Sequence, residues 1–210
     1  ERPCIFERIY FASPDSIVGE KTVYTYRKSL GEQLANENNI TADVVVPIPD
    51  SGVSAAIGFS QKSSIPFELG IIRSHYVGRT FIEPSQSIRQ FGVKLKHSVN
   101  KSCIENRKVI LIDDSIVRGT TASKIVKMVY EAGAKEVHLG ISCPPIMHPD
   151  FYGIDTPNYN ELIASQSDLN EMTKLVGAKS LFFLSLAGTY KAMGCDKRNP
   201  KTPQFTDHCF

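Results

Sequence analysis

Short apolar runs alternate with stretches of helical spacing along most of the chain. Apolar runs with β-branched side chains occupy residues 44–48, 69–72, 109–112 and 137–141, and one more apolar run occupies residues 181–184. They predict strands, because short continuous apolar runs are typical of strands that are covered on both sides.

Helical patterns lie between these runs. Tyr26, Leu30 and Leu34 fall four residues apart and would form one apolar face of a helix. Because strands then alternate with helices, we expect an α/β fold in which helices cover both faces of a mostly parallel sheet. Further helices are expected at residues 52–62, 122–132, 159–165 and 168–176.

Two segments interrupt this alternation. Residues 71–101 contain glycines, prolines, serines and basic side chains with little periodicity. Long connections inside a compact domain are usually functional, so this segment is expected to be an active-site lid. The tail, residues 196–210, is polar and contains prolines, and we expect it to pack loosely.

Composition narrows the class of protein. Hydrophobic residues make up 41% and charged residues 22% of the chain, as in soluble globular proteins. The formal charge of +2 calls for no nucleic-acid partner, and the apolar runs are too short to span a membrane. The five scattered cysteines form no C-x-x-C pair, so we expect no disulfide framework or zinc site and a cytoplasmic setting. Since the chain starts at Glu1 and not at methionine, we expect it to be a fragment of a longer polypeptide.

The segment VILIDDSIVRGTT, residues 109–121, carries the clearest chemistry. An apolar strand ends in Asp113 and Asp114, and a turn rich in hydroxyl groups then leads into a helix. Backbone N–H groups at such a helix start suit a phosphate monoester, whereas paired carboxylates suit sugar hydroxyls and Mg²⁺. The alternative is an ordinary turn whose polar side chains only cap the helix. The predicted phosphate loop consists of Ser115, Ile116, Val117, Arg118, Gly119, Thr120 and Thr121.

A second anion site is predicted after the strand at residues 44–48. The residues Pro49, Asp50, Ser51 and Gly52 follow that strand and precede a helix of small residues. A strand that ends just before a helix start can present N–H groups to an anion, although P-D-S-G is also an ordinary turn sequence.

The 109–121 segment resembles the signature of type I phosphoribosyltransferases that bind 5-phosphoribosyl-1-pyrophosphate (PRPP), in the form found in amidophosphoribosyltransferases. Four other segments resemble that family in the same order. The family fold implied is a five-stranded, mostly parallel sheet with helices on both faces, a flexible lid loop and a small hood. The four segments are IFERIYFASPDS (5–16), VPIPDSGVSAA (46–56), YVGRTFI (76–82) and YGID (152–155).

The resemblance implies roles for individual residues. Residues 115–121 would hold the 5′-phosphate, and residues 49–52 would hold the pyrophosphate. Asp113 and Asp114 would bind the ribose hydroxyls and, together with Ser51, the Mg²⁺ ion. In the lid, Arg73, Tyr76 and Arg79 are the candidate catalytic residues. Family members commonly read Lys-Asn-Arg where this chain has Arg73-Ser74-His75, so no role is assigned to His75.

The resemblance also implies a reaction and partners. Ammonia, supplied from glutamine in the full-length enzyme, would displace pyrophosphate from C1 of PRPP and give 5-phosphoribosylamine, the first committed step of purine synthesis. The expected organisation is an interdomain or hood segment (1–26), a phosphoribosyltransferase domain (27–195) and the tail (196–210), with an N-terminal glutaminase domain absent. A homo-oligomer and feedback inhibition by purine nucleotides are also implied. The alternatives are a PRPP-dependent nucleobase phosphoribosyltransferase and a non-enzymatic regulator on the same fold.

No iron–sulfur cluster is expected. Some family members bind one through four cysteines, and Cys4 stands at the first of those positions. Asp150 stands at the second, and the closing C-x-x-C pair is missing. Because four thiolates are the usual requirement, Cys4 is expected to be an inert buried thiol.

Overall fold

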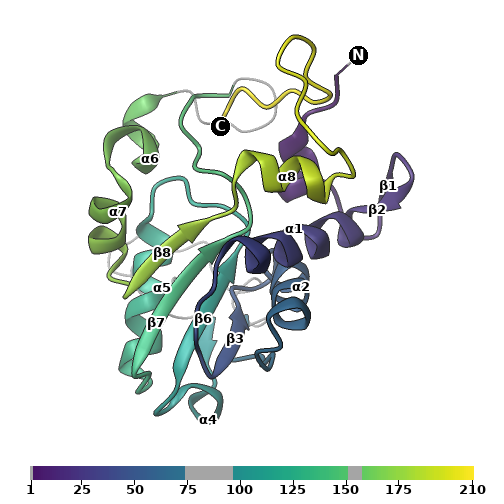
Figure 1. The fold of residues 1–210 in the computed structure, drawn as a ribbon. Coiled ribbons are helices and arrows are strands. Elements are labelled where there is room, and N and C mark those ends of the chain that lie inside the picture. Colours follow the sequence, from purple (N-terminus) through teal and green to yellow (C-terminus); the bar gives the residue numbers. More distant parts are fainter. Residues whose placement is uncertain (1, 74–96, 151–157) are drawn as a thin grey trace, which may run out of the picture.

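The computed structural model describes residues 2–73, 97–150 and 158–210 (Figure 1). Its centre is a four-stranded parallel sheet in the order β3-β6-β7-β8. Nearly all side chains of the three strands β3, β6 and β7 are buried, which explains their continuous apolar runs. The predicted parallel α/β fold is confirmed. The strands are β3 (Val44–Pro47), β6 (Lys108–Asp113), β7 (Glu136–Ile141) and β8 (Ser180–Phe183).

The run at residues 69–72 does not join this sheet. Strand β4 (Ile71–Arg73) pairs antiparallel with β5 (His97–Val99), and the two form a separate ribbon. Only Ile71 of β4 is buried, while Ile72 is 49% exposed, so the ribbon lies at the surface. Beside β3, Phe67 makes a single parallel bridge to Val45. Four strands, and not the five expected, therefore form the main sheet in the described part of the chain.

Helices cover both faces of the sheet, as predicted. Helices α1 and α2 pack against each other on one side, and α5 and α7 lie on the other (Figure 1). Asp168 and Glu171 form a reciprocal capping box at the start of α7, which fixes where that helix begins. The longer helices are α1 (Val23–Glu37), α2 (Val53–Ser63), α5 (Thr120–Glu131), α7 (Leu169–Val176) and α8 (Leu186–Ala192).

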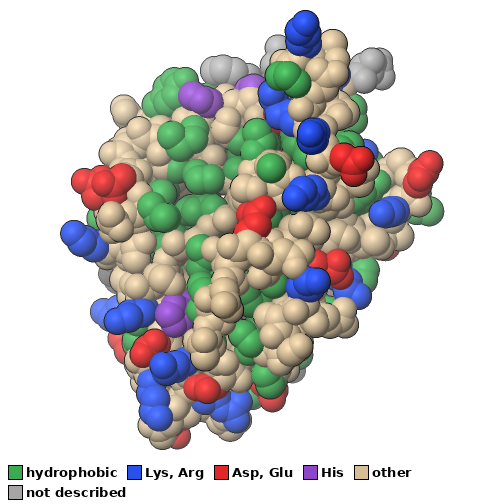
Figure 2. All heavy atoms as spheres, in the orientation of Figure 1, with side chains coloured by type: hydrophobic (Ala, Val, Ile, Leu, Met, Phe, Trp, Pro, Cys, Tyr) green, Lys and Arg blue, Asp and Glu red, His purple; other side chains and the backbone are tan. Residues whose placement is uncertain are grey.

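Short elements complete the described chain. A five-residue π-helix, η1 (Glu7–Phe11), precedes α1. The others are β1 (Ile17–Val18), β2 (Lys21–Thr22), α4 (Lys101–Ile104), η3 (Tyr159–Glu161) and α6 (Ile163–Gln166). In the described residues, no helix combines the length and apolar character that crossing a membrane requires. Figure 2 shows basic and acidic side chains interspersed over one face of the molecule.

The tail is packed, contrary to the expectation that it would be loose. Thr206 pairs with the N-terminal segment, since its N–H donates to Pro3 O (2.9 Å) and its carbonyl accepts from Ile5 N (3.1 Å). Buried Asp207 accepts a hydrogen bond from Tyr190 Oη at 2.8 Å and forms an ion pair with Arg198. The tail is thus anchored to both the first residues of the chain and α8. The predicted divisions after residues 26 and 195 stay predictions.

Candidate active site at the carboxyl edge of the sheet

A cavity of about 490 Å³ opens where strands β3 and β6 end. Ligands of open α/β sheets bind at this edge, because the loops after neighbouring parallel strands meet there. Both sequence segments predicted to bind anions contribute to its walls. The lining residues are Phe6, Tyr10, Ile48, Pro49, Ser51, His97, Asp113, Asp114, Ser115, Ile116, Val117, Arg118, Gly119, Thr120, Thr121 and Ala122.

The two loops are joined by a hydrogen bond. Ser51 Oγ donates to Asp114 Oδ1 at 3.0 Å, across 63 residues of sequence. Gly52 makes this approach possible, because a Cβ at that position would lie 2.3 Å from the backbone oxygen of Ile112. The 49–52 loop can therefore lie directly against the end of β6.

The carboxylate pair is closely packed. Asp114 is 5% exposed, and its second oxygen accepts a hydrogen bond from Ser115 Oγ at 3.3 Å. Asp113 accepts from the Asp114 backbone N–H at 2.9 Å. Burial, and then the negative charge of Asp114, raise the pKa of Asp113 well above its usual value. A cation or sugar hydroxyls at the pair would relieve this repulsion.

The oxygen-rich donor set suits Mg²⁺ better than a softer metal. Ser51, Asp113 and Asp114 supply one hydroxyl and two carboxylates within one cavity. Among the described residues, no group of three or more His, Cys, Asp or Glu side chains could hold a metal ion by itself. Mg²⁺ commonly keeps several waters and takes further oxygens from substrate phosphates, so this pair fits an ion that arrives with its substrate.

The predicted phosphate loop connects β6 to α5. Gly119, just before the helix, has φ of +75°, a conformation that other residues rarely adopt. Thr120 and Thr121 are exposed in the first turn of α5, where backbone N–H groups have no partner within the helix. Ile116 is buried and fixes the middle of the loop. These features leave N–H groups and hydroxyls at the cavity for an anion.

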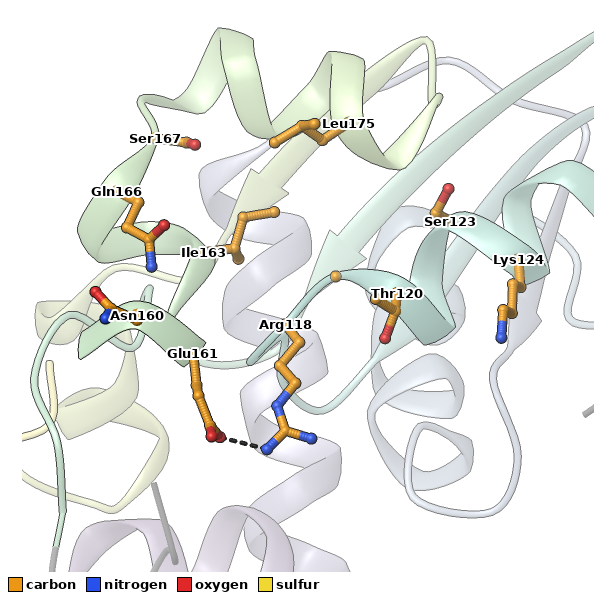
Figure 3. Close-up of a pocket in the computed structure, with 11 residues that line it drawn as sticks. Arg118, Thr120, Ser123, Lys124, Asn160, Glu161, Ile163, Gln166, Ser167 and Leu175 are labelled. Atoms are coloured by element: carbon orange, nitrogen blue, oxygen red, sulfur yellow. Dashed lines mark hydrogen bonds and ion pairs between the residues drawn. The ribbon is translucent and has the colours of Figure 1, made fainter. Parts of the chain in front are cut away.

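Arg118 lines both this cavity and a neighbouring hollow. Its guanidinium is ion-paired with Glu161 of η3, and the two side chains face each other (Figure 3). They lie in a neighbouring hollow of about 590 Å³ between the start of α5 and α6. Nearby, the Ile163 N–H donates to Val117 O at 2.9 Å. The segment that carries η3 and α6 therefore supports the phosphate loop from outside.

The lid candidates are described only in part. Arg73 ends β4, and its exposed guanidinium is ion-paired with the carboxylate of Asp50. Pro49 lines the cavity, and the peptide bond between Pro49 and Asp50 is cis. Tyr76 and Arg79 lie outside the described residues, so their catalytic roles stay predictions.

Several residues of the cavity had no role assigned from the sequence. Phe6 and Tyr10, from the segment that contains η1, form an aromatic side of the cavity, and His97 of β5 also lines it. Phe6 is 1% exposed and Tyr10 is 49% exposed. A signal was present in the sequence, since Phe6 and Tyr10 stand four positions apart in the IFERIYF segment and would share one face of a helix.

Cys4 was expected to be buried, but it is partly exposed. Cys209 of the tail is buried instead, and that burial raises the pKa of its thiol to about 12. Asp150 is also buried, with His208 Nε2 3.5 Å from its Oδ1. The expectation that no iron–sulfur cluster is bound stays a prediction.

Comparisons with known proteins agree with this geometry. Residues 27–150 match the family described as "Phosphoribosyl transferase domain". The chain is 61% identical over 211 residues to the amidophosphoribosyltransferase of Rhizobium etli, covering 100% of this chain and 42% of that protein. The Bacillus subtilis amidophosphoribosyltransferase is 51% identical over 191 residues, covering 91% of this chain and 40% of the relative.

A solved structure extends the likeness to three dimensions. The glutamine PRPP amidotransferase of Bacillus subtilis, complexed with ADP and GMP, superposes with a TM-score of 0.90 at 48% identity. The match covers 100% of this chain and 46% of that one. The chain thus spans less than half the length of these relatives. The resemblance that the sequence motifs indicated is confirmed.

Proposed function

Because this chain belongs to the phosphoribosyl transferase domain family, we propose that it binds Mg²⁺-PRPP and transfers ammonia to C1 of the ribose. The Ser51–Asp114 hydrogen bond carries the proposal, since it joins two anion loops around one acidic cavity. PRPP has a phosphate at one end and a pyrophosphate at the other, with two ribose hydroxyls between them. The cavity offers a loop for each anion and a carboxylate pair between the loops.

The reaction needs no covalent nucleophile. The bond between C1 and the pyrophosphate oxygen breaks, a bond between C1 and nitrogen forms, and the nitrogen releases a proton. Positive charge develops on the ribose ring in the transition state, and negative charge develops on the leaving pyrophosphate. Mg²⁺ would neutralise part of the pyrophosphate charge when bound.

The protein's own contribution is to hold the reacting groups and to exclude water. The loop of residues 115–121 would fix the 5′-phosphate, and Asp113 and Asp114 would accept hydrogen bonds from the ribose hydroxyls. Residues 49–52 would hold the pyrophosphate. In this scheme Arg73, Tyr76 and Arg79 complete the site from the lid. Arg79→Ala is therefore expected to lower kcat for pyrophosphate release.

The rest of the relatives' length is the proposed source of the ammonia. We propose that a glutaminase half of the same polypeptide supplies it, because this chain spans only 42% of its Rhizobium etli relative. Purine nucleotides are proposed as inhibitors, since a nucleoside 5′-phosphate shares its phosphate and ribose with PRPP. ADP and GMP are bound in the Bacillus subtilis relative. A homo-oligomer in the cytoplasm completes the proposal, although the soybean relative is chloroplastic.

Pyrophosphate release from Mg²⁺-PRPP tests the function. The 210-residue chain should release pyrophosphate with ammonium salts, faster at higher pH because NH₃ is the nucleophile, and not with glutamine. Asp114→Asn should abolish this activity, whereas Asp196→Asn, at an exposed position of the tail, should not change it. Equal rates with ammonia and glutamine would contradict the assignment. Faster release with a nucleobase than with ammonia would favour a salvage enzyme, and Mg²⁺-PRPP binding without turnover would favour a regulator.

A further inference from the structure

A buried arginine lies behind the aromatic side of the cavity. Arg27, on α1, is 5% exposed, and its guanidinium donates to three backbone carbonyls. Nε donates to Arg8 O at 3.1 Å, and Nη2 donates to Tyr10 O at 2.7 Å and to Ala12 O at 2.8 Å. One side chain of α1 thus holds the end of η1 and the residue after it.

Those carbonyls need an outside partner. The last carbonyl groups of a helix have no partner within the helix, and η1 is only five residues long. A short isolated helix is unstable in water, so its place depends on contacts from outside. The guanidinium is suited to this task because its planar fork directs several N–H groups at once.

The segment held in this way carries part of the cavity. Phe6 and Tyr10 line it together with Ser51 and the carboxylate pair. The ring centroids of Phe6 and Tyr10 are 6.2 Å apart, and the ring centroid of Phe11 lies 5.2 Å from that of Tyr10. We call Phe6 and Tyr10 the aromatic wall. It is formed by a segment that contains neither anion loop, so it can move without changing the groups that hold the two ends of PRPP.

The charge of Arg27 also interacts with the charge of Asp114. Burial lowers the pKa of Arg27, and the nearby negative charge of Asp114 opposes that effect. Arg27 thus holds the backbone that carries the aromatic wall and lies within electrostatic range of Asp114.

We propose that Arg27 is a positioning residue that fixes the aromatic wall over the reacting carbon, so that ammonia and not water attacks it. This inference rests on the proposed function. A sugar cation at C1 reacts with whichever nucleophile reaches it, and an apolar wall held in place lowers the access of water. If the wall loosens, pyrophosphate would still leave, but water would take a larger share of the turnovers.

Two substitutions separate geometry from charge. Arg27→Lys keeps the positive charge but lacks the planar fork that reaches the three carbonyls from two nitrogens, and Arg27→Met removes both charge and hydrogen bonds. In Arg27→Met, kcat with ammonia should fall by roughly 10- to 100-fold, as for a small misplacement near the reacting atoms. Its KM for PRPP should stay within about 3-fold of the wild-type value, because the phosphate and pyrophosphate loops are intact. The kcat of Arg27→Lys with ammonia should lie between those of the wild type and Arg27→Met.

The decisive measurement is the ratio of pyrophosphate released without ammonium to that released with it, at one pH and ionic strength. The ratio should rise in both Arg27 variants and in Tyr10→Ala, which shortens the wall directly at a half-exposed side chain. Lys28→Met, which removes a positive charge from the next position of α1, should keep the wild-type ratio. A rise in KM for PRPP with an unchanged ratio would overturn the proposal, as would a normal ratio in Arg27→Met.

Hydrogen exchange distinguishes this inference from the proposed function. Amides of residues 5–12 should exchange faster in Arg27→Met than in the wild type, whether or not the protein is active. Wild-type protein that releases no pyrophosphate with ammonia would refute the proposed function alone. Unchanged exchange in Arg27→Met would refute the positioning role alone. Should Arg27→Met fail to fold, Arg27→Lys and Tyr10→Ala still provide the ratio.

Discussion

Replacing Asp113 by asparagine removes one negative charge from the acid pair and keeps the size of the side chain. The amide oxygen can still accept the 2.9 Å hydrogen bond from the Asp114 N–H. The pKa of Asp113 is raised by burial and by Asp114, so the folded protein pays to ionise this carboxyl group. The variant should therefore be more stable than the wild type when neither Mg²⁺ nor PRPP is present.

The size of the gain is bounded by electrostatics. Two unit charges about 4 Å apart repel by about 4 kcal/mol at an effective dielectric constant of about 20. This value is an upper limit, because Asp113 can keep its proton. A gain of about 1–3 kcal/mol would raise Tm by about 2–12 °C for a chain of this length.

The gain should depend on pH in a defined direction. A carboxyl group with a raised pKa in the folded state binds more protons there than in the unfolded chain. Wild-type stability therefore falls as pH rises above about 4, the usual pKa of aspartate, until the folded-state pKa of Asp113 is passed. The difference between variant and wild type should be near zero below about pH 4 and largest at the alkaline end of this range.

Thermal unfolding in EDTA between pH 4 and pH 8 measures the gain in stability and its pH dependence. Thermal unfolding with Mg²⁺-PRPP then measures the stabilisation by the ligand. At about 100 times its Kd, Mg²⁺-PRPP should stabilise the wild type by about 2.7 kcal/mol. Asp113→Asn should lose most of that stabilisation and all but a small part of its activity. Asp196→Asn serves as the exposed control. A variant less stable than the wild type, or one that keeps the full response to Mg²⁺-PRPP, would refute the reasoning.

Three further predictions concern other parts of the molecule. Gly119→Ala should weaken Mg²⁺-PRPP binding measured by calorimetry and lower stability by about 1–2 kcal/mol, because alanine disfavours positive φ. Asp207→Ala should lower the free energy of unfolding by about 2–4 kcal/mol in urea, because it removes the buried partner of a tyrosine and an arginine. Alkylation with iodoacetamide, followed by mass spectrometry, should find Cys143 and Cys209 the slowest of the five thiols. Burial raises the pKa of both, whereas the other three are partly exposed. Retained binding in the glycine variant, an unchanged urea midpoint in Asp207→Ala, or fast labelling of either buried thiol would each contradict its prediction.

The parallel sheet could be predicted because its strands are specified locally. The apolar run at residues 109–112 became β6, and that at 137–141 became β7, with ends shifted by at most a residue. The run at residues 69–72 is also short and apolar, but β4, which begins within it, pairs with β5 in a separate ribbon and does not join the main sheet. Its partner there, His97–Val99, is polar at two of three positions and distant in sequence. Apolar composition predicts a strand but not which strand it joins.

The tail shows a second limit. Phe205, Asp207 and Cys209 are buried although their segment is mostly polar. Their burial depends on a backbone pairing with the first residues of the chain, about 200 positions away. Periodicity reports burial against an element's own neighbours, so a segment buried by pairing with a remote one gives no such signal.

The candidate site divides in the same way. The placement of its two loops at one cavity could be predicted, because each combines a strand end, a characteristic turn and a helix start within a dozen residues, and parallel strands bring their carboxyl ends together. The aromatic wall could not be predicted, because the position of η1 depends on Arg27, and an arginine on a helix is usually solvated. In the proposed function the loops hold PRPP, while the wall borders the space from which an acceptor must approach. Substitutions in the N-terminal segment and α1 should therefore change the acceptor without changing PRPP affinity, and substitutions in the loops should do the reverse.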